Sequence, residues 1–88
     1  MDWGRALEDC DVCISNDPTF IKPYIRKGNI QHFLKQYHKA IKTWDTALQL
    51  DPNNQEIKDG KMKTVMAINS GDRDKSAAER NMADPGMK

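Results

Sequence analysis

The 88-residue chain lacks several features that would place it in common protein classes. No run of about eighteen apolar residues is present, so no segment is long enough to span a membrane. No basic start followed by an apolar stretch occurs, which argues against a signal peptide. Cysteine occurs only at Cys10 and Cys13, which is too little for a disulfide scaffold. We therefore expect the reducing cytosol, hence a cytoplasmic localisation.

Charged residues are unevenly distributed along the chain: bases are scarce in its first part, and acids are absent from its middle part. Residues 1–18 hold five acids and one base, residues 19–44 hold six bases and no acid, and residues 45–88 hold eight acids and seven bases. The formal net charge of +1 therefore conceals a basic middle between acidic flanks. This pattern predicts an anionic partner, pairing between segments, or both. At this length the chain forms one small domain at most, with a thin core.

The sequence repeats itself after 34 residues. When the chain is shifted by that distance, identical residues coincide, including Ala6 with Ala40 and Asp17-Pro18 with Asp51-Pro52. The match weakens after Pro52. The chain therefore holds the end of one unit, one whole unit, and a segment that departs from the pattern.

Each unit is expected to form a pair of helices. Apolar residues recur at spacings of three and four, which predicts helices over about 4–16, 21–35, 38–50 and 55–69. The Asp-Pro pairs end the first and third helices, Pro23 fits only in a first turn, and Gly71 stops the last helix. No segment alternates with a period of two, so the predicted fold class is all-α.

Small and large residues indicate how the helices pack. Small side chains are expected where helices approach closely, at Gly28, Ala40 and Ala47, and the large partners are Tyr24, Tyr37 and Trp44. In the last helix, Ile57, Val65 and Ile68 are predicted to point inward. Its apolar stripe is interrupted by Gly60 and Lys61, as expected of a capping helix with one side in water.

The run Tyr24-x2-Lys27-Gly28, then Ala40-x3-Trp44, then Pro52, resembles the tetratricopeptide repeat pattern over about residues 3–69. Two positions depart from it: Lys27 replaces the usual leucine and Gln31 the usual tyrosine. The resemblance implies antiparallel helix-turn-helix repeats. Residues 1–17 would be the second helix of an incomplete repeat, 18–52 a full repeat, and 53–69 a C-terminal capping helix.

A narrower resemblance concerns the co-chaperones. The stretch from Phe20 to Gly28 resembles the last full repeat of a co-chaperone tetratricopeptide domain, and Ala6-Leu7-Glu8-Asp9-Cys10 the helix before it. The stretch from Glu79 to Pro85 resembles the opening of the aspartate-proline-rich domain in stress-inducible, chaperone-organising co-chaperones. Residues 70–88 would then be a flexible linker and the start of that domain, and the chain a fragment.

This resemblance implies a partner and a binding site. In the family, a groove holds the free C-terminal Glu-Glu-Val-Asp tail of heat-shock chaperones of the seventy- and ninety-kilodalton classes. It implies Lys22 and Arg26 as clamp cations, and their spacing of four places both on one helix face. Asn29 follows on roughly the same face and is a candidate for bonding the peptide main chain. The alternative interpretation is a solvated basic face, as we expect for Lys35, Lys39 and Lys42 unless acids of the preceding helix pair with them.

Other chemistries have weaker support. Cys10-x2-Cys13 lacks the βαβ context of a redox motif, and His32 and His38 lie beyond the usual zinc-finger spacing, so buried structural cysteines and surface histidines are predicted. Aromatic residues interleave with the basic ones, but most of them fall at packing positions and the net charge is only +1, so we expect no nucleic acid partner. No nucleophile stands beside a base and no phosphate loop occurs, so neither an enzyme nor a cofactor is expected.

Two expectations concern the isolated chain. The face of the first helix that bears Leu7 and Ile14, with Trp3 nearby, is predicted to be open to water, which predicts dimerisation or helix swapping. Because earlier repeats would supply the rest of the clamp, we expect weak or undetectable peptide binding by these 88 residues alone. The rival function within the same fold is a scaffold that binds another peptide or partner.

Overall fold

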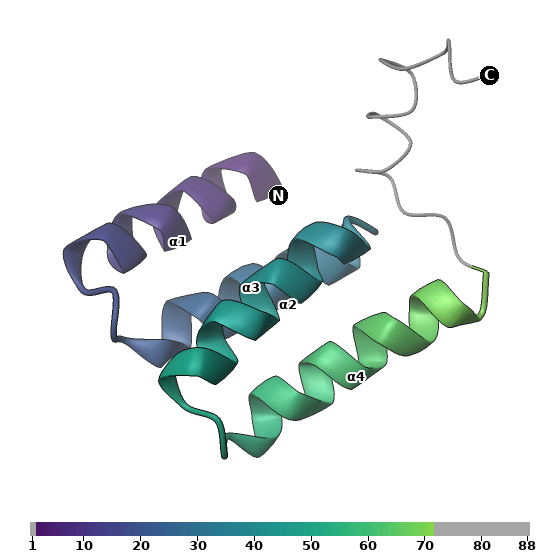
Figure 1. Cartoon of the computed structure of the whole chain (residues 1–88). Helices are drawn as coiled ribbons and strands as arrows, with labels where there is room; N and C mark the ends of the chain where they lie inside the picture. The colour runs from purple at the N-terminus through teal and green to yellow at the C-terminus, as the bar shows by residue number, and fades with distance from the viewer. Residues whose placement is uncertain (1, 72–88) are drawn as a thin grey trace, which may run out of the picture.

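The computed structural model describes residues 2–71, and these form four helices and no strand. The helices are α1 (Trp3–Asn16), α2 (Ile21–Phe33), α3 (Tyr37–Leu50) and α4 (Gln55–Asn69). Successive helices run antiparallel, and α1 and α4 lie on opposite sides of the central α2–α3 pair (Figure 1). The all-α class and the helix pairs predicted from the sequence are confirmed.

The two Asp-Pro pairs end their helices in the same way. The backbone N–H of Asp17 donates to the carbonyl of Cys13 at 3.0 Å, and that of Asp51 donates to Ala47 at 2.9 Å. Each aspartate carbonyl then accepts a bond from the N–H three residues later, at 3.0 Å for Asp17 and 3.1 Å for Asp51. Because proline cannot extend the preceding helix, the 34-residue period of the sequence reappears in the backbone.

The second helix is shorter than predicted, because it ends at Phe33 and not at Lys35. Lys35 has a φ of 63°, in the left-handed region. The Lys35 N–H donates to the His32 carbonyl at 2.9 Å, and the Gln36 N–H donates to the Gln31 carbonyl at 2.8 Å. These two bonds form a Schellman C-cap, a position that glycine usually occupies. With lysine there, no local sequence signal marked the end of the helix.

The core is centred on Trp44, whose side chain is 1% exposed. Its indole fills the space between two glycines. A Cβ added to Gly28 of α2 would lie 2.7 Å from the ring, and one added to Gly60 of α4 would lie 2.6 Å from it. Removing the indole would cost about 3–5 kcal/mol. The predicted burial of the large and small packing residues is confirmed for Tyr24, Gly28, Tyr37, Ala40, Trp44 and Ala47.

The inner face of α4 differs from the prediction. Gly60 lies against Trp44 and does not interrupt the packing face. Val65 and Ile68 are only half-buried, whereas Thr64 is fully buried at 0% exposure. The Thr64 hydroxyl accepts a hydrogen bond from Nε1 of Trp44 at 3.1 Å and donates to the Gly60 carbonyl at 2.8 Å. A polar residue fits this apolar position because its hydroxyl is hydrogen-bonded.

His32 also departs from the expected surface position. It is half-buried, with its Nδ1 3.0 Å from the Thr64 hydroxyl oxygen and its ring centroid 5.3 Å from that of Tyr37. His38 is exposed, as predicted. The difference arises because His32 lies on the side of α2 that meets α4, a long-range contact that the local pattern does not encode.

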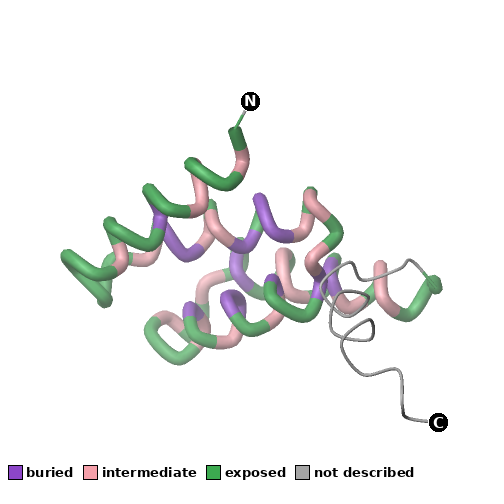
Figure 2. The backbone as a smooth tube through the Cα atoms, turned by 90° about the horizontal axis from the view of Figure 1, so that it is seen from above, coloured by how far each residue is buried: buried purple, intermediate pink, exposed green. Residues whose placement is uncertain are grey.

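The first helix turns its apolar stripe toward α2 and not toward water. Trp3, Leu7 and Ile14 are half-buried, and the Trp3 ring centroid lies 5.0 Å from that of Phe33. The prediction that this face is open is therefore wrong. Figure 2 shows that α1 nevertheless has far fewer buried residues than α2 and α3, because among the described helices only α2 packs closely against it.

The fourth helix ends at Asn69, and Gly71 follows with a φ of 92°, which glycine adopts without strain. The predicted linker and further domain fall, from residue 72 onward, outside the described residues. Between Asp2 and Gly71, no helix has the length and apolar character needed to cross a bilayer.

Candidate peptide-binding groove

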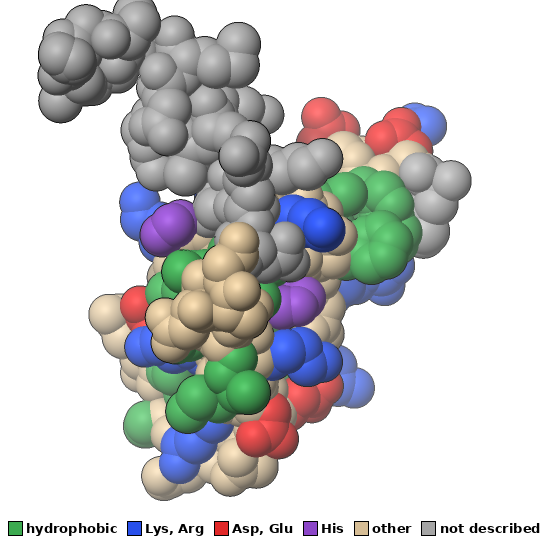
Figure 3. All heavy atoms as spheres, turned by 90° about the vertical axis from the view of Figure 1, so that its right-hand side faces the viewer, with side chains coloured by type: hydrophobic (Ala, Val, Ile, Leu, Met, Phe, Trp, Pro, Cys, Tyr) green, Lys and Arg blue, Asp and Glu red, His purple; other side chains and the backbone are tan. Residues whose placement is uncertain are grey.

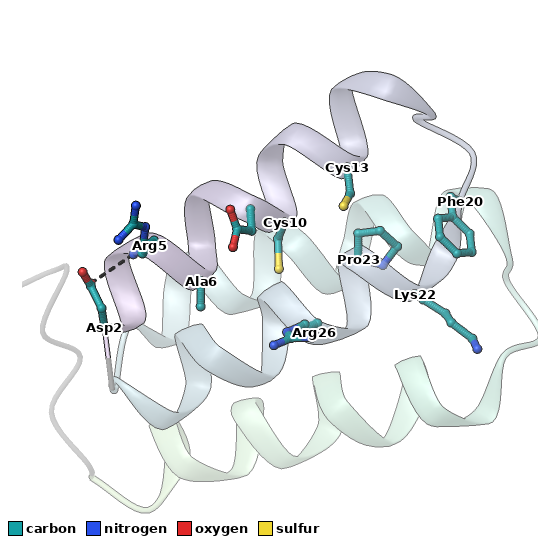
Figure 4. Close-up of a pocket in the computed structure, with 10 residues that line it drawn as sticks. Asp2, Arg5, Ala6, Cys10, Cys13, Phe20, Lys22, Pro23 and Arg26 are labelled. Carbon is teal, nitrogen blue, oxygen red and sulfur yellow. Dashed lines mark hydrogen bonds between the residues drawn. The ribbon is translucent and has the colours of Figure 1, made fainter.

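A groove of about 500 Å³ opens between α1 and the first half of α2. Its apolar lining comes from both helices and their connection, namely Ala6, Cys10, Cys13, Phe20 and Pro23. Its charged lining consists of Asp2, Arg5, Asp9, Lys22 and Arg26. Figure 4 shows the two cysteine side chains of α1 directed toward α2 across this groove.

The turn between α1 and α2 positions the first residues of α2 that line the groove. The Asp17 carboxylate accepts bonds from the Thr19 N–H at 3.2 Å and the Thr19 hydroxyl at 2.7 Å, which closes a tight turn. The Tyr24 hydroxyl donates to the Pro18 carbonyl at 2.8 Å and ties that turn to α2. Pro23 is the third residue of α2, where its missing N–H breaks no helical bond. The predicted first-turn position of Pro23 is confirmed.

The structure brings two of the predicted site residues to this groove. Lys22 and Arg26 both line it and both are exposed, and neither forms an ion pair within residues 2–71. Their charged ends point away from each other along α2 (Figure 4). Asn29 is exposed as well, but it is not among the residues that line the groove. The groove therefore offers two separated cations on one helix.

Sequence reasoning missed Arg5, a third cation at the groove. The repeat gave no signal for it, since the 34-residue shift aligns Arg5 with Lys39, which does not line this groove. Two acids, Asp2 and Asp9, also line the groove, but Asp2 caps α1 by accepting the Arg5 N–H at 3.1 Å. Three bases against two acids leave a modest positive balance.

The two cysteines are not equivalent. Cys10 is 3% exposed, and burial raises the pKa of its thiol above the ordinary value of 9.0, although the nearby Arg26 acts in the opposite direction. Cys13 is exposed, so the prediction of two buried cysteines is wrong for this residue. The repeat aligns Cys13 with the buried Ala47, but Ala47 lies between neighbouring helices whereas Cys13 faces the open groove.

Other kinds of site find no support in the geometry. Within residues 2–71, no three histidine, cysteine or acidic side chains gather where they could hold a metal ion. The face drawn in Figure 3 mixes basic, acidic and apolar side chains and presents no continuous basic surface. Among the aromatic residues of the basic segment, Tyr24, Tyr37 and Trp44 are buried and cannot stack on bases, whereas Phe20 and Phe33 are exposed and not at packing positions.

Residues 21–54 match the model of the tetratricopeptide repeat. This segment is α2, the turn after it, α3 and the Asp-Pro turn, the same unit that the 34-residue period marks. The chain belongs to the tetratricopeptide repeat family. Tetratricopeptide repeats are modules for binding other proteins, and the fold seen here is of that kind.

The two departures from the tetratricopeptide pattern are both explained by contacts. Lys27, where leucine is usual, forms an ion pair with Asp11 of α1 at 2.6 Å. Gln31, where tyrosine is usual, is 6% exposed, and its Oε1 accepts a bond from the Thr43 hydroxyl at 2.6 Å. Polar contacts between helices thus take the place of apolar packing at these two positions.

Relatives of the chain include proteins named for chaperone organisation. An Hsp70-Hsp90 organizing protein of Triticum aestivum is 48% identical over 69 residues, which is 78% of this chain and 12% of that protein. Stress-induced-phosphoprotein 1 of Caenorhabditis elegans is 42% identical over 85 residues, 97% of this chain and 26% of that protein. U-box domain-containing protein 70 of Oryza sativa subsp. japonica is 41% identical over 75 residues, 85% of this chain and 9% of that protein. The chain thus spans a small part of each relative.

Proposed function

We propose that this chain is the protein-interaction part of a co-chaperone and that it binds the C-terminal Glu-Glu-Val-Asp tail of heat-shock chaperones in the α1–α2 groove. In this role it acts by binding and not by catalysis, and the cytosol is its compartment. The observation that carries the proposal is the placement of Lys22 and Arg26 on one groove, neither in an ion pair within residues 2–71. The resemblance to chaperone-organising proteins supports the choice of ligand.

The chemistry of the two cations suits a peptide end. The planar guanidinium of Arg26 can hold a carboxylate through two parallel hydrogen bonds, and the ammonium of Lys22 acts as a compact point charge. Two cations of different shape suit the two carboxylates at the end of this ligand, the chain terminus and the aspartate side chain. The apolar wall at Pro23 and Phe20 is available to the valine side chain of the tail.

The magnitudes predict weak binding by this chain alone. Each hydrogen bond to a charged group contributes about 1.5–3 kcal/mol. Micromolar affinity needs about 8 kcal/mol after the peptide has been ordered. Two bonds from Arg26 and one from Lys22 reach that value only at the upper end of this range, and the acids of the same groove reduce their effect. We therefore expect a dissociation constant well above the micromolar range for the 88-residue chain.

A matched pair of peptides tests the proposal. A Glu-Glu-Val-Asp peptide with a free C-terminus is titrated into the isotope-labelled chain and followed by heteronuclear NMR, which detects weak binding. We expect shifts of the Lys22 and Arg26 amides, and smaller shifts with the same peptide amidated at its C-terminus. Arg26→Ala should abolish the difference between the peptides, whereas Lys58→Ala, an exposed lysine on α4, should preserve it.

Two results would contradict these expectations. Equal binding of the free and amidated peptides would exclude a carboxylate clamp. Low-micromolar affinity of the chain in calorimetry would contradict the weak-binding prediction while leaving the site itself in place. Asn29→Ala adds a further distinction, because Asn29 lies outside the groove lining and its removal should change affinity less than Arg26→Ala.

A tetratricopeptide scaffold for another partner is the second candidate. The observation that favours it is the 41% identity to a U-box protein, whose name mentions no chaperone. A scaffold of this kind would bind an internal peptide, so the amidated and free peptides would behave alike. The same titration therefore separates the two functions.

We also propose that the isolated chain associates with a second copy through the α1–α2 groove. The support is the apolar lining of the groove, in which the side chain of Phe20 is 49% exposed. Light scattering at high concentration should give a mass above that of the monomer, and substitution of Phe20 by a charged residue should lower it. A strict monomer at high concentration contradicts this proposal.

A further inference from the structure

A second groove, of about 400 Å³, lies on a different side of α2. Its lining comes from α1, α2 and α3, namely Ile14, Tyr24, Lys27, Gln31, Lys39, Lys42, Thr43 and Thr46. On α2 the first groove uses positions 22, 23 and 26, whereas the second uses 24, 27 and 31. The 3.6-residue turn places these two sets on different faces of the helix. A ligand in one groove therefore leaves the other accessible.

The charges in the second groove are all of one sign. Three lysines line it and no carboxylate does. Lys27 is already paired with Asp11 at 2.6 Å. Lys39 and Lys42 are exposed, lie three residues apart on α3, and form no ion pair within residues 2–71. Two positive charges at the mouth of a concave site attract anions more strongly than they would on a flat surface.

The polar wall of the groove also presents donors. Gln31 is 6% exposed, and its Oε1 is occupied by the hydroxyl of Thr43 at 2.6 Å. This bond orients the amide so that its Nε2 donors are left for a ligand. The Thr43 hydroxyl already donates to Gln31, and the Thr46 hydroxyl donates to the Lys42 carbonyl at 3.0 Å, so the donors of this wall come from the Gln31 amide.

The floor of the groove is apolar. Ile14 is half-buried and packs against the core cluster, and Tyr24 is 7% exposed with its hydroxyl bonded to Pro18. An apolar side chain of a ligand can contact this floor while neighbouring acidic side chains reach the two lysines. The site is thus arranged for alternating apolar and acidic groups.

We propose that this second groove binds an internal acidic peptide segment, in which one apolar side chain contacts Ile14 and flanking carboxylates pair with Lys39 and Lys42. A nucleic acid fits less well, because the only aromatic ring in the groove is buried and cannot stack on a base. A membrane surface fits less well because the two lysines stand at a concave site. The site needs no free C-terminus, so it does not depend on the clamp proposed above.

The test uses a peptide that cannot engage a carboxylate clamp. The probe is acetyl-Glu-Glu-Leu-Glu-Glu-amide, whose ends are both blocked, titrated into the whole chain and followed by heteronuclear NMR. We expect shifts at Lys39, Lys42 and Thr46 and none at Arg26. The peptide with glutamine in place of every glutamate should not bind. Arg26→Ala should leave the affinity unchanged, so failure of the clamp and failure of this site give different results.

Paired charge reversals locate the site. Lys39→Glu with Lys42→Glu should weaken binding of the probe by at least about fivefold, since it replaces attraction by repulsion. Lys58→Glu with Lys63→Glu makes the same change of net charge at exposed positions of α4 and should weaken it by less than about twofold. Lys39→Gln with Lys42→Gln provides a milder variant if the reversed one does not fold.

Several results would overturn the proposal. Equal weakening by the α3 and α4 reversals would show attraction by net charge alone. Absence of probe binding to the unaltered chain, or equal binding of the glutamine peptide, would exclude an acidic-peptide site. Binding of oligothymidylate or of phosphatidylserine vesicles in place of the peptide would assign the groove to another class of ligand.

Discussion

The hydroxyl of Thr64 lies 3.1 Å from Nε1 of Trp44, and this buried hydrogen bond joins α4 to the centre of the core. Gly60, one turn earlier on α4, lies against the face of the same indole. The two residues act together, because a side chain at position 60 would hold α4 too far away for the hydroxyl to reach the indole. The position of α4 against the core thus depends on Gly60 and Thr64, a small and a polar residue that the apolar spacing of the sequence does not mark.

Thr64→Val should lower the free energy of unfolding by about 1–3 kcal/mol, because the buried Trp44 N–H loses its acceptor while the side-chain volume is kept. Thr64→Ser keeps the hydroxyl and loses only a methyl group, so it serves as the control. Urea unfolding monitored by tryptophan fluorescence measures both. A loss confined to the serine variant would show that packing, and not the hydrogen bond, matters at this position.

Gly60→Ala should destabilise the chain by about 1–3 kcal/mol, because the new Cβ would overlap the Trp44 ring and α4 would have to move. Gly4→Ala is the matched control, since the nearest atom to an added Cβ there is the Asp2 side-chain oxygen at 3.5 Å. Alanine in that exposed helix should be neutral or stabilise by up to about 1 kcal/mol. Thermal unfolding followed by circular dichroism distinguishes the two, and equal behaviour would contradict the close approach.

Lys35→Gly should raise the stability by about 0.5–1 kcal/mol, because glycine adopts the left-handed conformation at the end of α2 without the strain that lysine bears. Lys42→Gly in the middle of α3 should instead destabilise by about 1 kcal/mol. Chemical unfolding of the two variants should therefore shift in opposite directions. A loss of stability in Lys35→Gly would mean that other contacts of the lysine outweigh the backbone strain.

Cys13 should react with iodoacetamide well before Cys10 in the folded chain. Cys13 is exposed, whereas Cys10 is 3% exposed and burial raises the pKa of its thiol, so less of the reactive thiolate is present at mildly alkaline pH. Mass spectrometry of the digested protein gives the order of labelling, with urea-unfolded chain as the control in which the two rates converge. Equal rates in the folded chain would contradict the buried position of Cys10.

The raised pKa of Cys10 also has a consequence for stability. The folded chain keeps the thiol proton to a higher pH than the unfolded chain, so deprotonation favours unfolding. Stability should therefore decline as pH rises past the ordinary thiol pKa of 9.0. Cys10→Ala removes this dependence, and Cys13→Ala should leave it in place.

Much of the candidate site could be predicted because it depends on spacing within one helix. Lys22 and Arg26 are four residues apart on α2, and helical geometry alone brings them to one side. Arg5 comes from another helix, and its arrival at the same groove depends on how α1 packs on α2. The second groove depends on three helices, and its lysines looked like an ordinary solvated face in the sequence.

Local patterns in the chain were sufficient for the helices and the repeat. The spacing of apolar residues, the two Asp-Pro pairs and the 34-residue period act through neighbours in the chain, so the helix positions follow from the sequence alone, except for the end of α2. The positions of Gly60, Thr64 and Cys13 relative to the core do not, because burial depends on which helix covers a face. The tertiary structure decided them: the packing of α4 on Trp44 places Gly60 and Thr64 in the core, and the groove between α1 and α2 leaves Cys13 exposed.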